Sequence, residues 1–262
     1  MKRVPEKQLA NNNSDAFDEI VPYQKPLKEH IRELRKRLLY CVITVAVSFF
    51  IIVTFFADGL MQLLASPIRE RGIEFIYLGL AEALTAQLRV SFIVALAVSS
   101  PLVFWHIWDF VKPALYDSEK KAVLGFTFGS IILFLAGIAF GYGVVFLSAI
   151  TFFVYTGENV ATPMLSISQY VSFLFGFVLS FGLVFEMPIV TYVLCKTGIV
   201  TVAQLVAIRK YIVLVIFIVA AFLTPPDALS QILMALPMLV LYEIGIVVAR
   251  LTCGKNEVEV KE

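Results

Sequence analysis

The chain alternates between long uncharged runs and short charged segments, and this pattern predicts its helices. The runs are 38–57, 90–108, 122–157, 159–195 with Glu186 inside it, 211–226, and 228–249 with Glu243 inside it. A helix needs about 20 apolar residues to cross the hydrocarbon of a bilayer. We therefore predict an all-α integral membrane protein with six transmembrane helices. The run 122–157 is too long for one span and too short for two, so we expect one tilted helix that projects beyond the bilayer.

The last two predicted helices are unusual. As a helix, the apolar stretch 211–223 would be about 20 Å long, against about 30 Å of hydrocarbon. We expect Pro237 to interrupt the sixth helix, which also carries Glu243, so that both helices are short. Either their flanking side chains extend to the interface, or this edge of the protein faces a thinned bilayer and binds partner helices.

Composition and charge exclude a soluble fold and orient the helices. The chain is 60% hydrophobic and 16% charged, whereas soluble domains are roughly 25% charged. If both termini are cytoplasmic, the inner segments hold 18 of the 21 Lys and Arg residues, and the outer segments hold only Arg69, Arg71 and Arg89. The excess of positive charge on cytoplasmic segments therefore predicts that both termini lie inside.

The same distribution divides the chain into three parts. We predict a disordered cytoplasmic extension at 1–25, a six-span membrane domain at 26–250 and a cytoplasmic tail at 251–262. Residues 1–37 lack the pattern of a cleavable signal peptide, so we expect the first span to be retained.

Candidate catalytic chemistry is sparse in this sequence. Cys41, Cys195 and Cys253 fall at predicted cytoplasmic helix ends, where disulfides are rare. His30 and His106 are far apart in sequence, and we expect no metal site. Neither a nucleophile–base pair nor a Gly-rich phosphate loop is present. The sequence predicts a protein that is not an enzyme, that uses no cofactor and that binds no nucleic acid.

Two acidic residues lie on the predicted cytoplasmic face. Residues 27–37 place apolar side chains every three or four positions, which suits a helix lying in the membrane interface. Within it, the local sequence favours an ion pair of Glu33 with Arg37, four residues on. Glu119 precedes two lysines and, taken alone, is an ordinary acid at a helix N-terminus.

Glu186 differs because it lies inside an apolar run. An acid at mid-membrane costs about 2.5–3.5 kcal/mol on insertion scales, and such groups usually face an interior or a wet cavity. Pro188, two residues on, is expected to kink the helix and open a polar notch. The alternative is a neutral carboxyl group that is hydrogen-bonded to a neighbouring helix.

Two segments are expected to form turns on the outer side. The stretch 65–68, with Pro67, is compatible with a surface turn. In 224–231, Pro225 and Pro226 end one helix, and Asp227 or Ser230 can cap the next.

Four motifs in order carry a family resemblance. They are H-I-R-E-L-R-K-R-L before the first span, F-V-K-P-A-L-Y-x-x-E-K-K after the second, F-G-L-V-F-E-M-P in the fourth, and L-T-P-P-D-A-L-S-Q between the fifth and sixth. From about Pro26 to Arg250 the chain resembles the TatC family of the twin-arginine protein translocase. The resemblance implies a glove-like concave bundle in the inner membrane that binds twin-arginine signal peptides of folded cargo. It also implies an oligomeric assembly with TatA- and TatB-like single-span proteins, driven by the proton gradient.

The resemblance assigns roles to individual residues. The residues implied in signal-peptide binding are Glu33, Arg35, Phe110, Pro113, Tyr116 and Glu119. Those implied at the membrane cavity are Glu186 and Pro188. Those implied in outer loops and partner contacts are Pro67, Phe222, Leu223, Pro225, Asp227 and Gln231. A guanidinium group pairs a carboxylate in a bidentate way that lysine cannot reproduce, which gives the two cytoplasmic acids a physical reason to select arginine.

An alternative from another class stays open on the residues alone. A proton-coupled transporter of small solutes would use Glu186 as its proton carrier and would not depend on Glu33 or Glu119. A receptor would instead lose cargo binding when either cytoplasmic acid is replaced.

Overall fold

The structure is a computed structural model that describes residues 27–70, 72–112, 123–158, 164–224 and 227–253. The predicted extension 1–25 and most of the predicted tail lie outside these ranges. Along the chain, the elements are α2 (Leu27–Phe55), α3 (Ala57–Arg69), β1 (Phe75–Ile76), α4 (Glu82–Val111), α5 (Val123–Phe140), the π-helical η3 (Gly141–Phe146), α6 (Leu147–Glu158), β2 (Leu165–Ser166), α7 (Ile167–Val184), α8 (Met187–Lys196), α9 (Val202–Ala207), α10 (Arg209–Leu223) and α11 (Ala228–Cys253).

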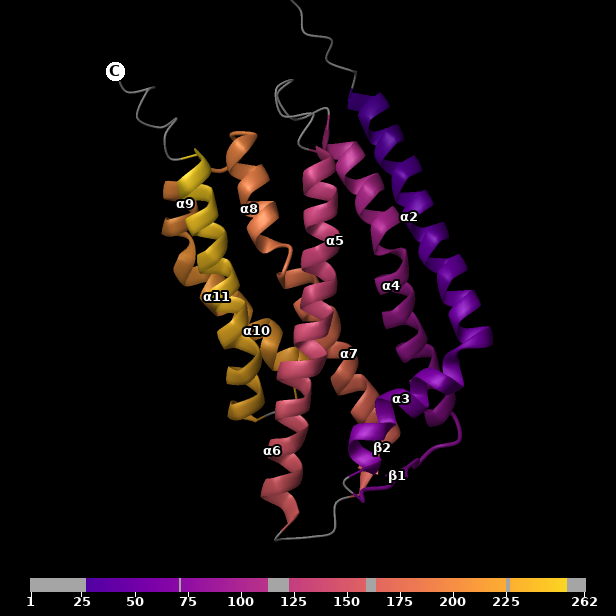
Figure 1. The fold of residues 1–262 in the computed structure, drawn as a ribbon. Coiled ribbons are helices and arrows are strands. Elements are labelled where there is room, and N and C mark those ends of the chain that lie inside the picture. Colours follow the sequence, from indigo (N-terminus) through magenta and orange to yellow (C-terminus); the bar gives the residue numbers. More distant parts are fainter. Residues whose placement is uncertain (1–26, 71, 113–122, 159–163, 225–226, 254–262) are drawn as a thin grey trace, which may run out of the picture.

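Within the described ranges, five helical stretches are long and apolar enough to cross a membrane. They are Ile31–Phe55, Glu82–Val111, Val123–Thr156, Ile167–Lys196 and Ala228–Thr252. The third confirms the prediction of one long helix, because α5, η3 and α6 follow one another without a break (Figure 1). The predicted short fifth helix is also confirmed: α10 has 15 residues, or about 22 Å.

Two predictions about helix shape are wrong. Helix α11 runs through Pro237 without interruption and has 26 residues, so the sixth apolar helix is not short. Proline is tolerated inside membrane helices where packing and neighbouring groups compensate for the lost hydrogen bond, and the adjoining Met234 and Met238 are buried. The stretch 65–68 is not a turn but part of α3, with Pro67 inside the helix.

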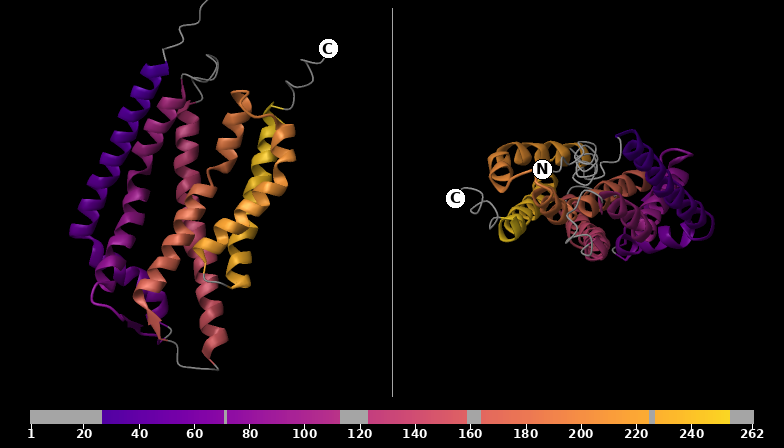
Figure 2. Two further views of the ribbon diagram at one scale, coloured as in Figure 1. Left: turned by 180° about the vertical axis from the view of Figure 1, so that it is seen from behind. Right: turned by 90° about the horizontal axis from the view of Figure 1, so that it is seen from above.

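The helices form a bundle with two distinct ends. The start of α2 and the end of α11 lie at one end, which we call the terminal end, and the two short strands lie at the other, the sheet end (Figure 1). Helix α2 packs on α4, α4 packs on α5 and α7, and α11 packs on α8 and α10. Viewed from above, α2 and α11 lie on opposite sides of the bundle (Figure 2). The end of α10 and the start of α11 lie part-way along the bundle, short of the sheet end (Figure 1).

A two-stranded parallel sheet ties the sheet end together. Phe75 pairs with Leu165 and Ile76 with Ser166. Glu82, in the first turn of α4, accepts a hydrogen bond from the Ser166 hydroxyl at 3.3 Å. The sheet therefore anchors the connection between α3 and α4 to the start of α7.

Helix α7 is the most enclosed element of the bundle. Half of the residues in the apolar stretch within Ile167–Lys196 are buried, against 6% of those in the stretch within Ile31–Phe55. Phe146, Phe177 and Phe181 are fully buried. At the crossing of α5 and α7 the backbones approach closely, because a Cβ atom on Gly137 would overlap the Phe181 carbonyl and one on Gly182 would lie 2.9 Å from the Phe134 ring.

Replacing Gly137 by alanine should destabilise this crossing. The added methyl group would force α5 away from α7, at a cost of about 1–3 kcal/mol in unfolding free energy. The measurement is the thermal unfolding midpoint of the purified protein in lipid nanodiscs. Gly125→Ala is the matched control in the same helix, because nothing lies within 4 Å of its added Cβ and alanine favours helix. Equal midpoints for the two variants would contradict the close approach.

Candidate functional site

Helix α2 presents Glu33 and Arg37 on one face at the terminal end. One turn apart, they form the ion pair that the sequence predicts: Arg37 donates to Glu33 Oε1 from Nη2 at 2.6 Å and from Nε at 3.2 Å. The Glu33 side chain is only 24% exposed, and the Arg37 side chain is 18% exposed. This partial burial makes the pair stronger than a fully solvated surface pair, which contributes about 0–1 kcal/mol.

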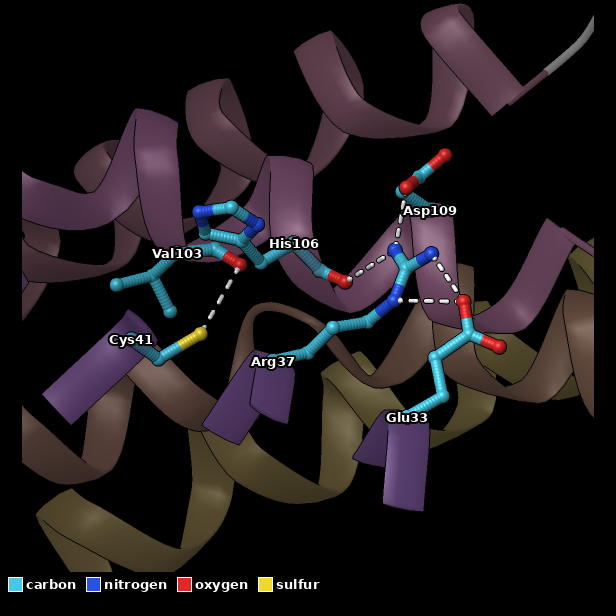
Figure 3. A network of polar contacts seen from close by, with 6 residues as sticks. All are labelled: Glu33, Arg37, Cys41, Val103, His106 and Asp109. Carbon is cyan, nitrogen blue, oxygen red and sulfur yellow. Dashed lines mark hydrogen bonds and ion pairs between the residues drawn. The ribbon is translucent and has the colours of Figure 1, made fainter. Parts of the chain in front are cut away.

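A second carboxylate reaches the same guanidinium group from α4. Arg37 Nη1 donates to Asp109 Oδ2 and, more weakly, to the backbone carbonyl of His106 at 3.5 Å (Figure 3). Asp109 is a site residue that the sequence reasoning missed. Its only signal was its place three residues after His106, on the same face of a helix, and this spacing says nothing about contact with α2.

These side chains line a polar groove of about 460 Å³. The groove is lined by Arg32, Glu33, Lys36, Arg37, Tyr40, His106 and Asp109. The rings of Tyr40 and His106 lie 5.6 Å apart, and the Lys36 ammonium lies 5.8 Å from the Tyr40 ring centre. Two carboxylates here hold one guanidinium group, so the groove contains the chemistry that binds arginine.

The remaining residues predicted for signal-peptide binding lie near the groove or outside the described ranges. Phe110 follows Asp109 directly and is half-buried, while Arg35 is exposed on α2. Arg37, and not Arg35, makes the ion pair with Glu33. Pro113, Tyr116 and Glu119 lie outside the described residues, so the structure says nothing of how they are placed.

Glu186 lies in the packed interior at a break between two helices. Helix α7 ends at Val184 and α8 begins at Met187, with Pro188 in its first turn, which confirms the predicted interruption. The Glu186 side chain is 8% exposed. The Ser130 hydroxyl of α5 lies close to its carboxyl group, whose Oε1 atom has no hydrogen-bond partner among the described residues.

The Glu186 cluster extends to α4 through a buried tryptophan. The indole Nε1 of Trp108 donates to Ser130 Oγ at 3.0 Å. Ser130, which lies close to the Glu186 carboxyl group, is thus bonded to α4. Trp108 precedes Asp109, so a single turn of α4 contributes to this cluster and to the groove.

The predicted outer residues fall in two places. Pro67 is half-buried within α3. Asp227 confirms the predicted capping, because its Oδ1 accepts from the Ser230 backbone N–H at 2.7 Å. The Gln231 amide donates to the Phe217 carbonyl at 3.0 Å and so joins α11 to α10. Phe222 is 85% exposed.

Two further positions complete the description of this turn. Leu223 is half-buried at the end of α10, and Pro225 lies outside the described residues. Among the residues that the structure describes, no three His, Cys, Asp or Glu side chains gather in a group that could hold a metal ion.

The fold and its two polar clusters define a multi-pass, all-helical membrane protein with five long apolar helices and charged groups at the terminal end. The sequence profile described as "Sec-independent protein translocase protein (TatC)" matches residues 29–237. The chain belongs to the TatC family and is a receptor subunit of the twin-arginine translocase. It is thus a transport protein and not an enzyme.

Individual relatives agree over nearly the whole chain. The Sec-independent protein translocase protein TatC of Carboxydothermus hydrogenoformans is 40% identical over 225 residues, covering 86% of this chain and 92% of that protein. The Aquifex aeolicus protein of the same name is 39% identical over 236 residues, covering 88% and 98%. A crystal structure of the twin-arginine translocase receptor TatC superimposes with a TM-score of 0.79 at 39% identity, covering 85% of this chain and 99% of that one. These matches favour the translocase over the small-solute transporter.

Replacing Ser130 by alanine should destabilise the Glu186 cluster. The change removes the acceptor of the Trp108 indole N–H and leaves this buried donor unpaired, at a cost of about 1–3 kcal/mol. The thermal unfolding midpoint in nanodiscs measures the effect. Thr127→Val, on the same helix, is the control, because the Thr127 hydroxyl bonds only the Val123 carbonyl of its own helix. A shift no larger than that of the control would contradict the cluster.

Proposed function

We propose that the chain binds the twin-arginine signal peptides of folded cargo in the groove at the terminal end. The observation that carries this proposal is the geometry around Arg37, where Glu33 and Asp109 bind a guanidinium group between two helices. Partial burial strengthens such charge-assisted hydrogen bonds. A site that already accommodates the planar fork of an arginine is suited to arginines of a peptide.

Other residues complete the proposed peptide site. Glu119 supplies a second carboxylate for the second arginine of the pair. Phe110, Pro113 and Tyr116 reduce the access of water to it, which sharpens selection of arginine over lysine. Arg35 contributes positive charge that repels wrongly placed cations.

We also propose that the terminal end faces the cytoplasm and that α10 counts as a sixth, short span. The protein is then a glove-like bundle of the inner membrane with both termini inside. Two observations support this: the start of α2 and the end of α11 share one end of the bundle (Figure 1), and positive charge predominates in the segments at that end.

The edge formed by α10 and α11 is the proposed binding surface for TatA- and TatB-like single-span proteins. Helix α10 is shorter than the bilayer is thick, and Phe222 and Leu223 present apolar surface at its end. Pro225, Asp227 and Gln231 complete the turn beside them, and Pro67 belongs to an outer segment of the assembly. Such partners would assemble as an oligomer in response to the proton gradient.

Glu186 and Pro188 form the proposed polar notch in the membrane cavity. The break between α7 and α8 places Glu186 inside the bundle with its Oε1 atom unpaired among the described residues, and ionisable groups at membrane depth usually face an interior or a wet cavity. This places Glu186 in a step after signal-peptide binding.

Replacing either cytoplasmic acid should abolish recognition. In Glu33→Ala or Glu119→Ala, a peptide guanidinium loses its carboxylate partner, and binding of a twin-arginine peptide should fall by tenfold or more, or about 1.4 kcal/mol. The measurement is the Kd, for the full-length protein in nanodiscs, of a peptide that carries a photocrosslinking probe, together with the adducts that this peptide forms with the protein.

The control peptide carries two lysines in place of the arginines. Adducts with the arginine peptide alone, lost in both variants while the protein still inserts in the membrane, are the expected result. Equal labelling by the two peptides, or unchanged affinity in both variants, would overturn the proposed site.

Glu186→Ala should separate binding from transport. The variant should bind the twin-arginine peptide with the Kd of the wild type, because Glu186 does not line the groove. Export of a folded cargo protein by cells that carry the variant as their sole TatC should fall severalfold. Export at the wild-type rate would rule out the cavity role.

A further inference from the structure

Arg37 already occupies the position that the proposed peptide arginine must take. Two of its N–H groups, on Nε and Nη2, converge on Oε1 of Glu33 at 3.2 and 2.6 Å. At 18% exposure, its side chain is better covered than either carboxylate that it binds. A peptide guanidinium that pairs with Glu33 in the bidentate manner must therefore compete with Arg37 for the same oxygen.

Asp109 offers Arg37 a second place to bind. It contacts Nη1, on the opposite edge of the guanidinium from the Nε contact with Glu33. Its side chain is 45% exposed, so it can follow a small movement of Arg37 without unpacking the interior. If Arg37 releases Glu33, it keeps a carboxylate partner and is not left half-buried without one, which would be costly.

We propose that Arg37 is an internal occupant of the arginine site. Asp109 is a positioning residue that keeps Arg37 bound when a peptide arginine displaces it from Glu33. This inference rests on the proposed function of the groove. Binding then exchanges one guanidinium for another on Glu33, with no carboxylate or guanidinium group left unpaired.

The exchange also accounts for selection of arginine. An incoming arginine replaces the two N–H contacts that Arg37 gives up, because its fork matches the carboxylate. A lysine ammonium is a compact point charge without that fork, so it cannot reproduce both contacts and competes poorly with Arg37. Arg37 is thus expected to lower the affinity for both peptides, and more strongly for lysine.

Four variants of the full-length protein in nanodiscs test the exchange. They are Asp109→Asn, Asp109→Glu, Arg37→Gln and the double variant Arg37→Gln/Asp109→Asn. The readout is the Kd, by fluorescence anisotropy, of a labelled twin-arginine peptide and of its twin-lysine counterpart. Thermal midpoints of all variants establish that each is folded.

The expected pattern depends on the background. Asp109→Asn should weaken twin-arginine binding about fivefold, since Arg37 loses its alternative partner, and Asp109→Glu should restore it. Arg37→Gln should bind the twin-arginine peptide at least as well as the wild type and should lower the preference for arginine over lysine. In the Arg37→Gln background, Asp109→Asn should have no effect.

Each other outcome overturns the exchange in a recognisable way. Weaker binding of the twin-arginine peptide by Arg37→Gln would mean that Arg37 only joins α2 to α4. An equal loss from Asp109→Asn in both backgrounds would mean that Asp109 attracts the peptide directly. Equal affinity of the wild type for the two peptides would overturn the proposed function itself, and this inference with it.

Glu243→Gln controls for the loss of an ion pair between helices. Arg209 and Glu243 join α10 to α11 at 2.8 Å with 45% exposure of each side chain, and neither lines the groove. The expected result is a wild-type Kd for both peptides. A loss as large as that of Asp109→Asn would show that any weakened helix contact reduces binding, which overturns the specific role of Asp109.

Discussion

The close packing of α7 against its neighbours is the interaction on which the rest of the bundle depends. In a bilayer, apolar side chains gain little by leaving lipid for protein, so helices associate through tight contact and internal hydrogen bonds. Gly137 and Gly182 allow α5 and α7 to approach until backbone meets backbone. The aromatic rings of Phe173 and Phe177, 4.6 Å apart, fill the space beside that crossing. Helices α4, α5 and α11 and the η3 turn take their positions from α7.

This packing explains why the two polar clusters lie where they do. Helix α7 breaks before Glu186, inside the bundle, where the Ser130 hydroxyl of α5 lies close to the carboxyl group. Trp108 donates to the same hydroxyl and holds the last turn of α4 in register with α5. Successive residues of a helix are about 100° apart, so Asp109 points away from that interior, toward α2 and Arg37. The groove is therefore positioned by the same helix turn that closes the buried cluster.

The sequence predicts features that depend on local periodicity and misses those that depend on contacts between distant segments. The apolar runs, the short α10, the Glu33–Arg37 pair and the Asp227 cap are all encoded within a few residues of one another. Asp109 was not predicted as a site residue because its partner, Arg37, lies 72 positions away along the chain. The sheet was not predicted because strands of two residues show no alternation of apolar and polar side chains. For Pro67 and Pro237, local propensity was misleading, since packing kept both prolines inside helices.

Helix α10 is too short to span the hydrocarbon layer, and hydrogen bonds beside its end pair the polar groups there. A helix of about 22 Å cannot reach both surfaces of a 30 Å hydrocarbon layer, so polar groups at its end would meet lipid unless the bilayer thins. The Thr224 hydroxyl bonds the Ala220 carbonyl at 2.8 Å, Asp227 caps α11, and Gln231 bonds a carbonyl of α10. Each of these hydrogen bonds pairs a polar group within the protein, so that this group does not need water as a partner. Internal pairing thus reduces the cost of ending a helix below the bilayer surface, while α5, η3 and α6 extend far beyond that end on the same side (Figure 1).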